Sequence, residues 1–179
     1  GLDPQTSAVV AVALTTEAGD EVFTGPEAAL LTRLDERLLE LAPGVIVTWN
    51  GATFDLPFLD ARAIRLGVAL HLRLTEDPRM APSDRRGPLR HVYRATWGPH
   101  RHLDGYRLYR ADVGRTLGFP CGLKPMARLV GLQPVEVDRA QIHQLSAAEL
   151  HDYVASDARL ARELVLRRMP AAAQFADAP

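Results

Sequence analysis

The sequence of 179 residues is poor in two chemically informative residue types, with one cysteine, Cys121, and one lysine, Lys124. A single cysteine excludes a framework of intramolecular disulfides and leaves the compartment undecided. No apolar run reaches the roughly 18 residues of a membrane span, and no signal-peptide pattern is present, so we expect a cytoplasmic protein with no membrane partner. The formal net charge of −1 provides no overall attraction to nucleic acid.

The basic residues are unevenly distributed, although the net charge is small. Nine arginines but only four acidic residues occur between His71 and Arg110. Arginine presents a planar fork that suits phosphate groups, and we select Arg85, Arg86 and Arg90 as candidate nucleic-acid-binding residues. Biased codon usage in a GC-rich genome explains the same excess of arginine over lysine, so both interpretations stay open at this point.

Length and composition predict one globular domain of the α/β class. With 47% hydrophobic and 24% charged residues, the chain can bury a substantial core. We expect this domain over residues 1–169, and a disordered tail or linker over the Ala/Pro-rich residues 170–179. Strands that alternate with helices after an initial hairpin indicate a mixed sheet flanked by helices.

The expected elements follow from periodicity and from turn residues. Strands are expected at Ala8–Leu14, Glu21–Thr24, Val45–Trp49, Arg90–Trp97 and Arg101–Asp104. The first of these is an unbroken apolar run that suits a buried strand. Helices are expected from Pro26 to Leu41 and over Asp55–Leu66, Tyr106–Leu117 and Leu123–Val130. The last helix begins at a capping box, Ser146 to Glu149, and runs to about Met169. Residues 75–90 are expected to form a loop.

A strand, a sharp turn and an acidic residue follow one another in the segment Trp49–Leu59, WNGATFDLPFL. Asn50 and Gly51 form the turn, and Asp55 begins the next helix. An Asp at the start of a helix is also a good cap, because its side chain can accept a backbone N–H group. By itself, this segment therefore fits a structural role for Asp55 as well as a functional one.

The second informative segment is Tyr153–Asp157, YVASD, inside the last helix. Tyr153 and Asp157 are four residues apart and therefore share one face of that helix. The same face carries Leu150 and Leu164, so we expect it to face the core. A buried Asp is unfavourable unless it is ion-paired, hydrogen-bonded or bound to a metal, and the helix itself offers no partner. A metal site and a salt bridge to an arginine elsewhere are the two explanations.

Together the two segments resemble motifs of the DEDD superfamily of 3′→5′ exonucleases. Asn50–Leu59 resembles the second exonuclease motif, most closely that of the proofreading domain of family-B DNA polymerases. Tyr153–Ala158 resembles the third motif of the Tyr-containing (DEDDy) branch, and the order and separation of the two segments also fit. The resemblance extends over nearly the whole chain, and it implies a ribonuclease H-like fold.

The resemblance also implies a cofactor and a role for several residues. The cofactor is a pair of divalent cations, Mg²⁺ or Mn²⁺, for which carboxylates are suitable ligands. Asp157 would bind one cation, Asp55 would bind the second at least partly through water, and Tyr153 would orient the attacking water. Asn50 would lie near the sugar and phosphate of the 3′-terminal nucleotide. Asp104 is a possible accessory carboxylate, although a role in a turn or cap explains it better.

One motif of the superfamily is absent, because no Asp-x-Glu segment occurs in the sequence. Gly1–Pro4, GLDP, resembles the residues that commonly follow that motif, so we expect the motif and its central strand upstream of Gly1. We then expect little nuclease activity from the 179 residues alone and activity from the natural full-length form. We also predict that the carboxylates of Asp55 and Asp157 lie close enough to share one metal cluster.

Three functions remain compatible with the sequence. The first is hydrolysis of nucleotides, one at a time, from the 3′ end of DNA, which the resemblance to family-B polymerases favours. The second is the same reaction on RNA. The third is a non-catalytic ribonuclease H-like module that binds nucleic acid or protein, and its full-length gene would lack Asp-x-Glu.

Overall fold

The computed structural model describes residues 3–80 and 87–169, and the chain divides into two compact units. Unit 1 comprises Gly1–Val10 and Thr24–Asp104, and unit 2 comprises Ala11–Phe23 and Gly105–Pro179. The expected tail at 170–179 and the candidates Arg85 and Arg86 lie outside the described residues. None of the helices in the described part of the chain is long and apolar enough to cross a membrane.

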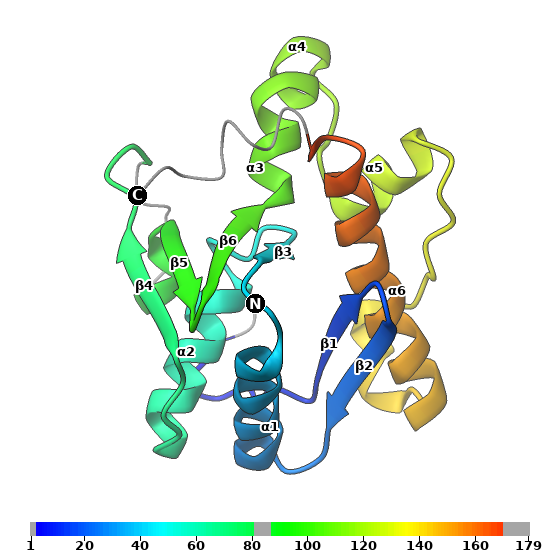
Figure 1. Cartoon of the computed structure of the whole chain (residues 1–179). Helices are drawn as coiled ribbons and strands as arrows, with labels where there is room; N and C mark the ends of the chain where they lie inside the picture. The colour runs from blue at the N-terminus through cyan, green and yellow to red at the C-terminus, as the bar shows by residue number, and fades with distance from the viewer. Residues whose placement is uncertain (1–2, 81–86, 170–179) are drawn as a thin grey trace. The chain divides into compact units, whose positions relative to one another are not determined.

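Unit 1 contains a four-stranded mixed sheet and two main helices (Figure 1). Its strands are β3 (Val45–Thr48), β4 (Leu72–Glu76), β5 (Tyr93–Trp97) and β6 (His100–Asp104), in the order β3-β6-β5-β4. β3 and β6 are parallel, whereas the β4–β5 and β5–β6 pairs are antiparallel. The helices are α1 (Glu27–Glu40) and α2 (Asp55–Leu66), and a 3-10 turn, η1, covers Gly87–Arg90. The expected mixed α/β class is confirmed.

The two helices of unit 1 bury their apolar stripes, as their helical spacing predicts. The buried residues of α1 include Leu30, Leu31, Leu34 and Leu38, and those of α2 include Leu56, Phe58, Leu59 and Ala63. Side chains of the sheet that are buried include Leu72, Ala95 and Trp97. The core of unit 1 therefore positions the end of β3 and the start of α2, between which the second motif lies.

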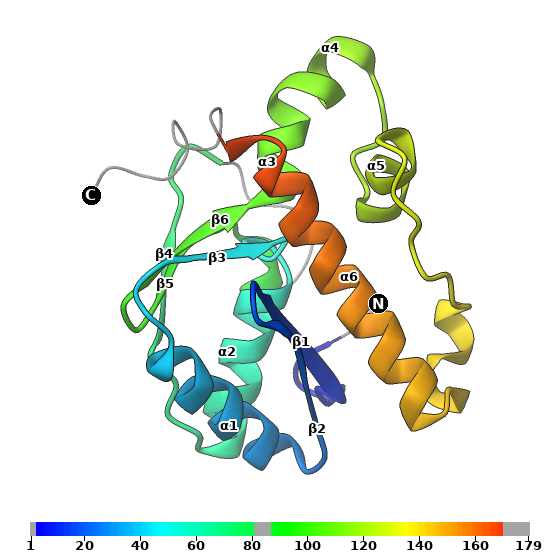
Figure 2. The same ribbon diagram turned by 45° about the vertical axis from the view of Figure 1, so that its right-hand side comes forward.

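Unit 2 combines a β-hairpin with several helices. The hairpin is formed by β1 (Ala11–Thr16) and β2 (Gly19–Thr24). The helices are α3 (Gly105–Tyr109), the π-helical η2 (Arg110–Gly114), α4 (Arg115–Leu117), α5 (Leu123–Leu129), the 3-10 η3 (Arg139–Gln144) and α6 (Ala147–Leu166). The long helix α6 packs along β1 (Figure 2).

The start of α6 confirms the predicted capping box. Oγ of Ser146 accepts the N–H of Glu149 at 3.2 Å, and the Glu149 carboxylate accepts the N–H of Ser146 at 2.8 Å. Two of the N–H groups that a helix start leaves without partners are thus satisfied.

Three expectations about the elements are wrong in detail. The first strand is Ala11–Thr16, not Ala8–Leu14, and it is only partly buried because among the described strands it pairs with β2 alone. β4 was not expected, since its short alternation becomes a strand only through antiparallel pairing with β5. The helix expected over Tyr106–Leu117 is interrupted by the wider π-helical turn of η2, which changes the face presented after it.

Candidate functional site

The chain reverses sharply just after β3, where the second motif begins. Asn50 has a positive φ of 67°, which is uncommon for a residue other than glycine. Its carbonyl oxygen accepts the N–H groups of Thr53 and Phe54 at 3.2 and 3.1 Å. At Gly51 an added Cβ would lie 2.2 Å from Oγ1 of Thr48, so any larger residue requires movement. The turn therefore depends on the particular residues Asn50 and Gly51.

Asp104 supports this turn from the end of β6, the strand that pairs with β3. The pairing places Asp104 opposite Thr48. Its Oδ1 accepts the N–H of Asn50 at 2.8 Å, and its Oδ2 accepts the N–H of Ala52 at 3.1 Å. Asp104 is 5% exposed, so these charge-assisted hydrogen bonds are shielded from water. This geometry matches the turn role that the sequence favoured for Asp104.

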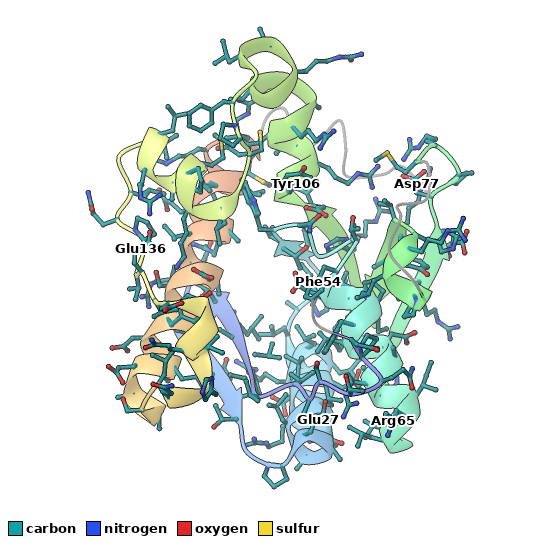
Figure 3. All side chains as sticks on the ribbon, turned by 180° about the vertical axis from the view of Figure 1, so that it is seen from behind. Glu27, Phe54, Arg65, Asp77, Tyr106 and Glu136 are labelled. Atoms are coloured by element: carbon teal, nitrogen blue, oxygen red, sulfur yellow. The ribbon has the colours of Figure 1, made fainter. Side chains whose placement is uncertain are left out.

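Asp55 is the first residue of α2, and Phe54 occupies the N-cap without a side-chain hydrogen bond (Figure 3). Capping therefore does not account for Asp55. Its side chain keeps an exposed surface, but neighbouring protein atoms reduce the hydration of the carboxyl group. This burial, followed by the negative charge of Asp104, raises the pKa of Asp55 to about 6, against the opposing effect of its own backbone N–H. The surroundings disfavour the charged carboxylate, which a nearby cation would stabilise.

Asp104→Asn is expected to lower the free energy of unfolding by about 1–3 kcal/mol, because asparagine has one acceptor oxygen for two buried N–H donors. Urea unfolding measures this change. Asp152→Asn is the matched control, since the side chain of Asp152 is 76% exposed. Equal stabilities of the two variants would contradict the role of Asp104 in holding the turn.

Tyr153 and Asp157 lie one turn apart on α6, and Lys124 from α5 lies beside both. Nζ of Lys124 is 4.6 Å from the centroid of the Tyr153 ring and 4.0 Å from Oδ1 of Asp157. The Lys124 side chain is 10% exposed, so this cation is largely removed from water. The alternative considered for Asp157, a salt bridge to an arginine, needs correction: the basic group beside it is the single lysine, whose flexible stem reaches it from α5.

Lys124 is the residue of this site that the sequence analysis missed. Its Nζ donates to the carbonyl oxygen of Val135 at 2.5 Å, and Oγ of Ser156 accepts the N–H of Val135 at 3.2 Å. These two bonds fix Val135 between α5 and α6 and hold Lys124 in place. The available signal was composition, because the other twenty basic residues of the chain are arginines. A lysine in such a chain marks a place where a compact charge is needed in place of the arginine fork.

The predicted site residues fall into two groups. Asn50, Asp55 and Asp104 lie close together in unit 1, whereas Tyr153 and Asp157 belong to unit 2. The close approach of Asp55 to Asp157 therefore stays a prediction.

The carboxylates fit a divalent cation in kind but not in number. Asp55 and Asp157 offer the hard oxygen ligands that Mg²⁺ and Mn²⁺ prefer. Within residues 3–80 and 87–169, however, no group of three or more His, Cys, Asp or Glu side chains is arranged to hold a metal ion. Both oxygens of Asp104 already accept backbone N–H groups. We therefore assign no complete metal centre to the described residues.

Comparisons with known proteins agree with the second motif. The family described as DNA polymerase family B, exonuclease domain, matches residues 10–91, which include Asp55. The catalytic polypeptide of DNA polymerase epsilon from Eremothecium gossypii is 33% identical over 113 residues, which are 63% of this chain and 5% of that protein. The corresponding polypeptide from Candida glabrata is 31% identical over 136 residues, which are 74% of this chain and 6% of that protein. The chain thus spans a small fraction of the length of these relatives.

A solved structure has the same fold. The family B DNA polymerase from the hyperthermophilic archaeon Pyrobaculum calidifontis matches with a TM-score of 0.72 and 23% identity, over 95% of this chain and 23% of that one. The class is therefore a mixed α/β domain of the kind found in family-B DNA polymerases. Within that class, the chain is related to the proofreading exonuclease domain, and the recognition made from its motifs is confirmed.

Proposed function

We propose that the chain is a DEDDy-type 3′→5′ exonuclease domain that hydrolyses phosphodiester bonds at the 3′ end of DNA and releases nucleotides. Its cofactor would be two divalent cations, Mg²⁺ or Mn²⁺. The related proteins are DNA polymerases, which supports DNA over RNA as the substrate. Since the described residues hold no group of three metal ligands, activity would require the two further carboxylates of an Asp-x-Glu strand, which this sequence does not contain.

The observation that carries this proposal is the way in which Asp55 is presented. The left-handed Asn50 and the hydrogen bonds from Asp104 place Asp55 at the start of α2, where it does not act as the cap. Asp55 also lies inside the segment that matches the exonuclease family. A carboxylate held beside a second acid, without a capping role, suits a cation site, whereas a purely structural role does not explain it.

In unit 2 the proposed roles fall to residues of α6 and α5. Asp157 would bind a cation, and the hydroxyl of Tyr153 would orient the attacking water. Two bound cations would stabilise the entering and leaving oxygens of the displacement. Lys124 would act as a positioning residue, because its cation–π contact restrains the Tyr153 ring and its charge offsets that of Asp157. Asn50 would contact the 3′-terminal nucleotide.

The deciding experiment compares the 179-residue chain with a form in which a strand carrying Asp-x-Glu precedes Gly1. The substrate is a 5′-labelled single strand of DNA, with an RNA strand of the same sequence in parallel, in Mg²⁺ or Mn²⁺. We expect the extended form to shorten the DNA stepwise from its 3′ end and the unextended chain to show little activity, because it has fewer metal ligands.

Each other outcome identifies a different error. Equal rates for the two forms would show that the catalytic acids are wrongly assigned. Faster shortening of the RNA strand would favour the ribonuclease alternative. Absence of hydrolysis by both forms, together with a natural gene that lacks the two acids, would favour a non-catalytic binding module.

Tyr153→Phe in the extended form is expected to reduce kcat by roughly 10- to 100-fold with little change in KM, because only orientation of the water is lost. The ring that contacts Lys124 remains, so the melting temperature should stay the same. Tyr106→Phe is the matched control, since the Tyr106 hydroxyl accepts a hydrogen bond from Arg110 on the surface. A raised KM with unchanged kcat would contradict the proposed role of Tyr153.

A further inference from the structure

The four-stranded sheet of unit 1 carries several arginines on one face. Arg73 of β4 pairs with Thr96 of β5, and Thr96 pairs with Arg101 of β6. Directly paired residues point to the same face of a sheet, so these three form a row across three strands. Arg94, which is opposite Thr75, lies two residues before Thr96 and joins the same face. All five residues are exposed, and we call this surface the arginine face.

The other face of the same strands has the opposite character. Leu72, Trp97 and His100 alternate with the exposed residues and are buried. The acidic residues of these strands also have that parity, since Glu76 lies on the side of Leu72 and Asp104 on the side of His100. The exposed positions of β4, β5 and β6 on the arginine face therefore carry arginine and threonine, but no acidic residue.

The carboxylate of Asp77 borders the arginine face (Figure 3). Asp77 is buried just after β4, with its Oδ1 3.8 Å from Nη2 of Arg94 and 3.0 Å from Nε of Arg79. One negative charge thus lies between two positive ones. The surroundings of Asp77 stay net positive, and Arg73 and Arg101 add further positive charge to the face.

We propose that the arginine face binds the phosphate backbone of single-stranded nucleic acid. Arginine forks pair with phosphate oxygens through two hydrogen bonds. Neighbouring strands are about 4.8 Å apart, so Arg73 and Arg101 are separated by roughly 10 Å and can reach separate phosphates of one strand. Aromatic side chains, which are typical of the centre of a protein interface, are absent from these exposed positions. The choice of nucleic acid as the polyanion rests on the proposed nuclease function.

The arginine face lies away from the candidate acids within unit 1. Arg101 is paired with Val45 at the start of β3, whereas Asp55 follows the end of that strand. The four residues of β3 span about 10 Å between the two ends. The face would therefore hold a part of the strand other than the nucleotide being removed, and its binding can be measured separately from hydrolysis.

The test measures the affinity of the 179-residue chain for a fluorescent oligo(dT) of about 20 nucleotides, without divalent cations, at several salt concentrations. Each phosphate contact contributes about 0.7 to the slope of log affinity against log salt for a single strand, so Arg73→Gln with Arg101→Gln should reduce the slope by about 1.4. The double Arg→Lys variant should retain most of the slope because it keeps both charges.

The matched control is Arg65→Gln with Arg115→Gln, which removes two exposed arginines from α2 and α4. Equal slopes for this control and for the variant of the arginine face would overturn the proposal. Melting temperatures of the variants should match that of the parent, because all four side chains are exposed. Since binding is measured without cations, a failure of the nuclease proposal would leave the slope change intact, and hydrolysis with an unchanged slope would reject only the arginine face.

Discussion

Asp157→Asn is expected to reduce cation-dependent release of nucleotides by at least about 100- to 1,000-fold in the form that carries the Asp-x-Glu strand. Asparagine preserves the size of the side chain but removes the negative charge and one carboxylate oxygen, both of which a hard divalent cation requires. Nζ of Lys124, 4.0 Å from Oδ1 of Asp157, would then lie beside a neutral group and further disfavour cation binding. Initial rates at saturating Mg²⁺ or Mn²⁺ measure the effect.

Asp152→Asn provides the control on the same helix, since the side chain of Asp152 is 76% exposed. A second measurement does not depend on hydrolysis. Mn²⁺ should raise the melting temperature of the extended form, because a ligand that binds only the folded state stabilises it, and Asp157→Asn should diminish this increase. Full activity and an unchanged Mn²⁺ response in Asp157→Asn would remove Asp157 from the proposed site.

Glu27→Ala is expected to lower the free energy of unfolding by about 3–5 kcal/mol, because it leaves the buried guanidinium of Arg62 without its carboxylate. Nε and Nη2 of Arg62 donate to the two oxygens of Glu27 at 2.8 and 2.6 Å, and Nη1 donates to the carbonyl of Pro4 at 2.8 Å. The N–H of Val9 donates to Oε1 of Glu27 at 2.7 Å. The pair thus joins α1, α2 and the segment before β1. For a domain of this size the loss corresponds to a fall in melting temperature of roughly 6–20 °C.

Glu40→Ala is the matched control on α1. Glu40 pairs with Arg37, but its side chain is 68% exposed, and such a surface pair contributes about 0–1 kcal/mol. The side chains of Arg62 and Glu27 are only 8% and 12% exposed. Glu27→Leu combined with Arg62→Met should recover much of the stability, because it leaves no unpaired charge. Losses of similar size in Glu27→Ala and Glu40→Ala would refute the importance of the buried pair.

The same pair has a defined dependence on pH. The hydrogen bonds from Arg62 hold the pKa of Glu27 below its ordinary value, against the opposing effect of burial. A lowered pKa in the folded state stabilises the protein at pH values above the ordinary value of about 4.3, and this stabilisation is lost as the pH falls through the folded-state pKa. The difference in stability between the parent and Glu27→Ala should therefore be largest near neutral pH and should shrink below about pH 4.

The sequence by itself determined the features whose causes act within a few residues. The capping box at Ser146 and the bounds of α2, Asp55–Leu66, both follow from caps and helical periodicity. Asn50 and Gly51 were recognised as a turn because these residues tolerate backbone conformations that others do not. The two exonuclease motifs were readable for the same reason, since each is a short run of neighbouring residues.

Only the tertiary structure decided the features that depend on pairing between distant segments. Asp104 supports the turn at Asn50 from 54 residues away, and this follows from the parallel pairing of β3 with β6. Lys124 reaches Tyr153 only because α5 packs against α6. The arginine face exists because antiparallel pairing aligns β4, β5 and β6, and a shift of one residue would send each of its side chains to the opposite face. No spacing along the chain encodes such alignments, since they are set by how the strands and helices pack together.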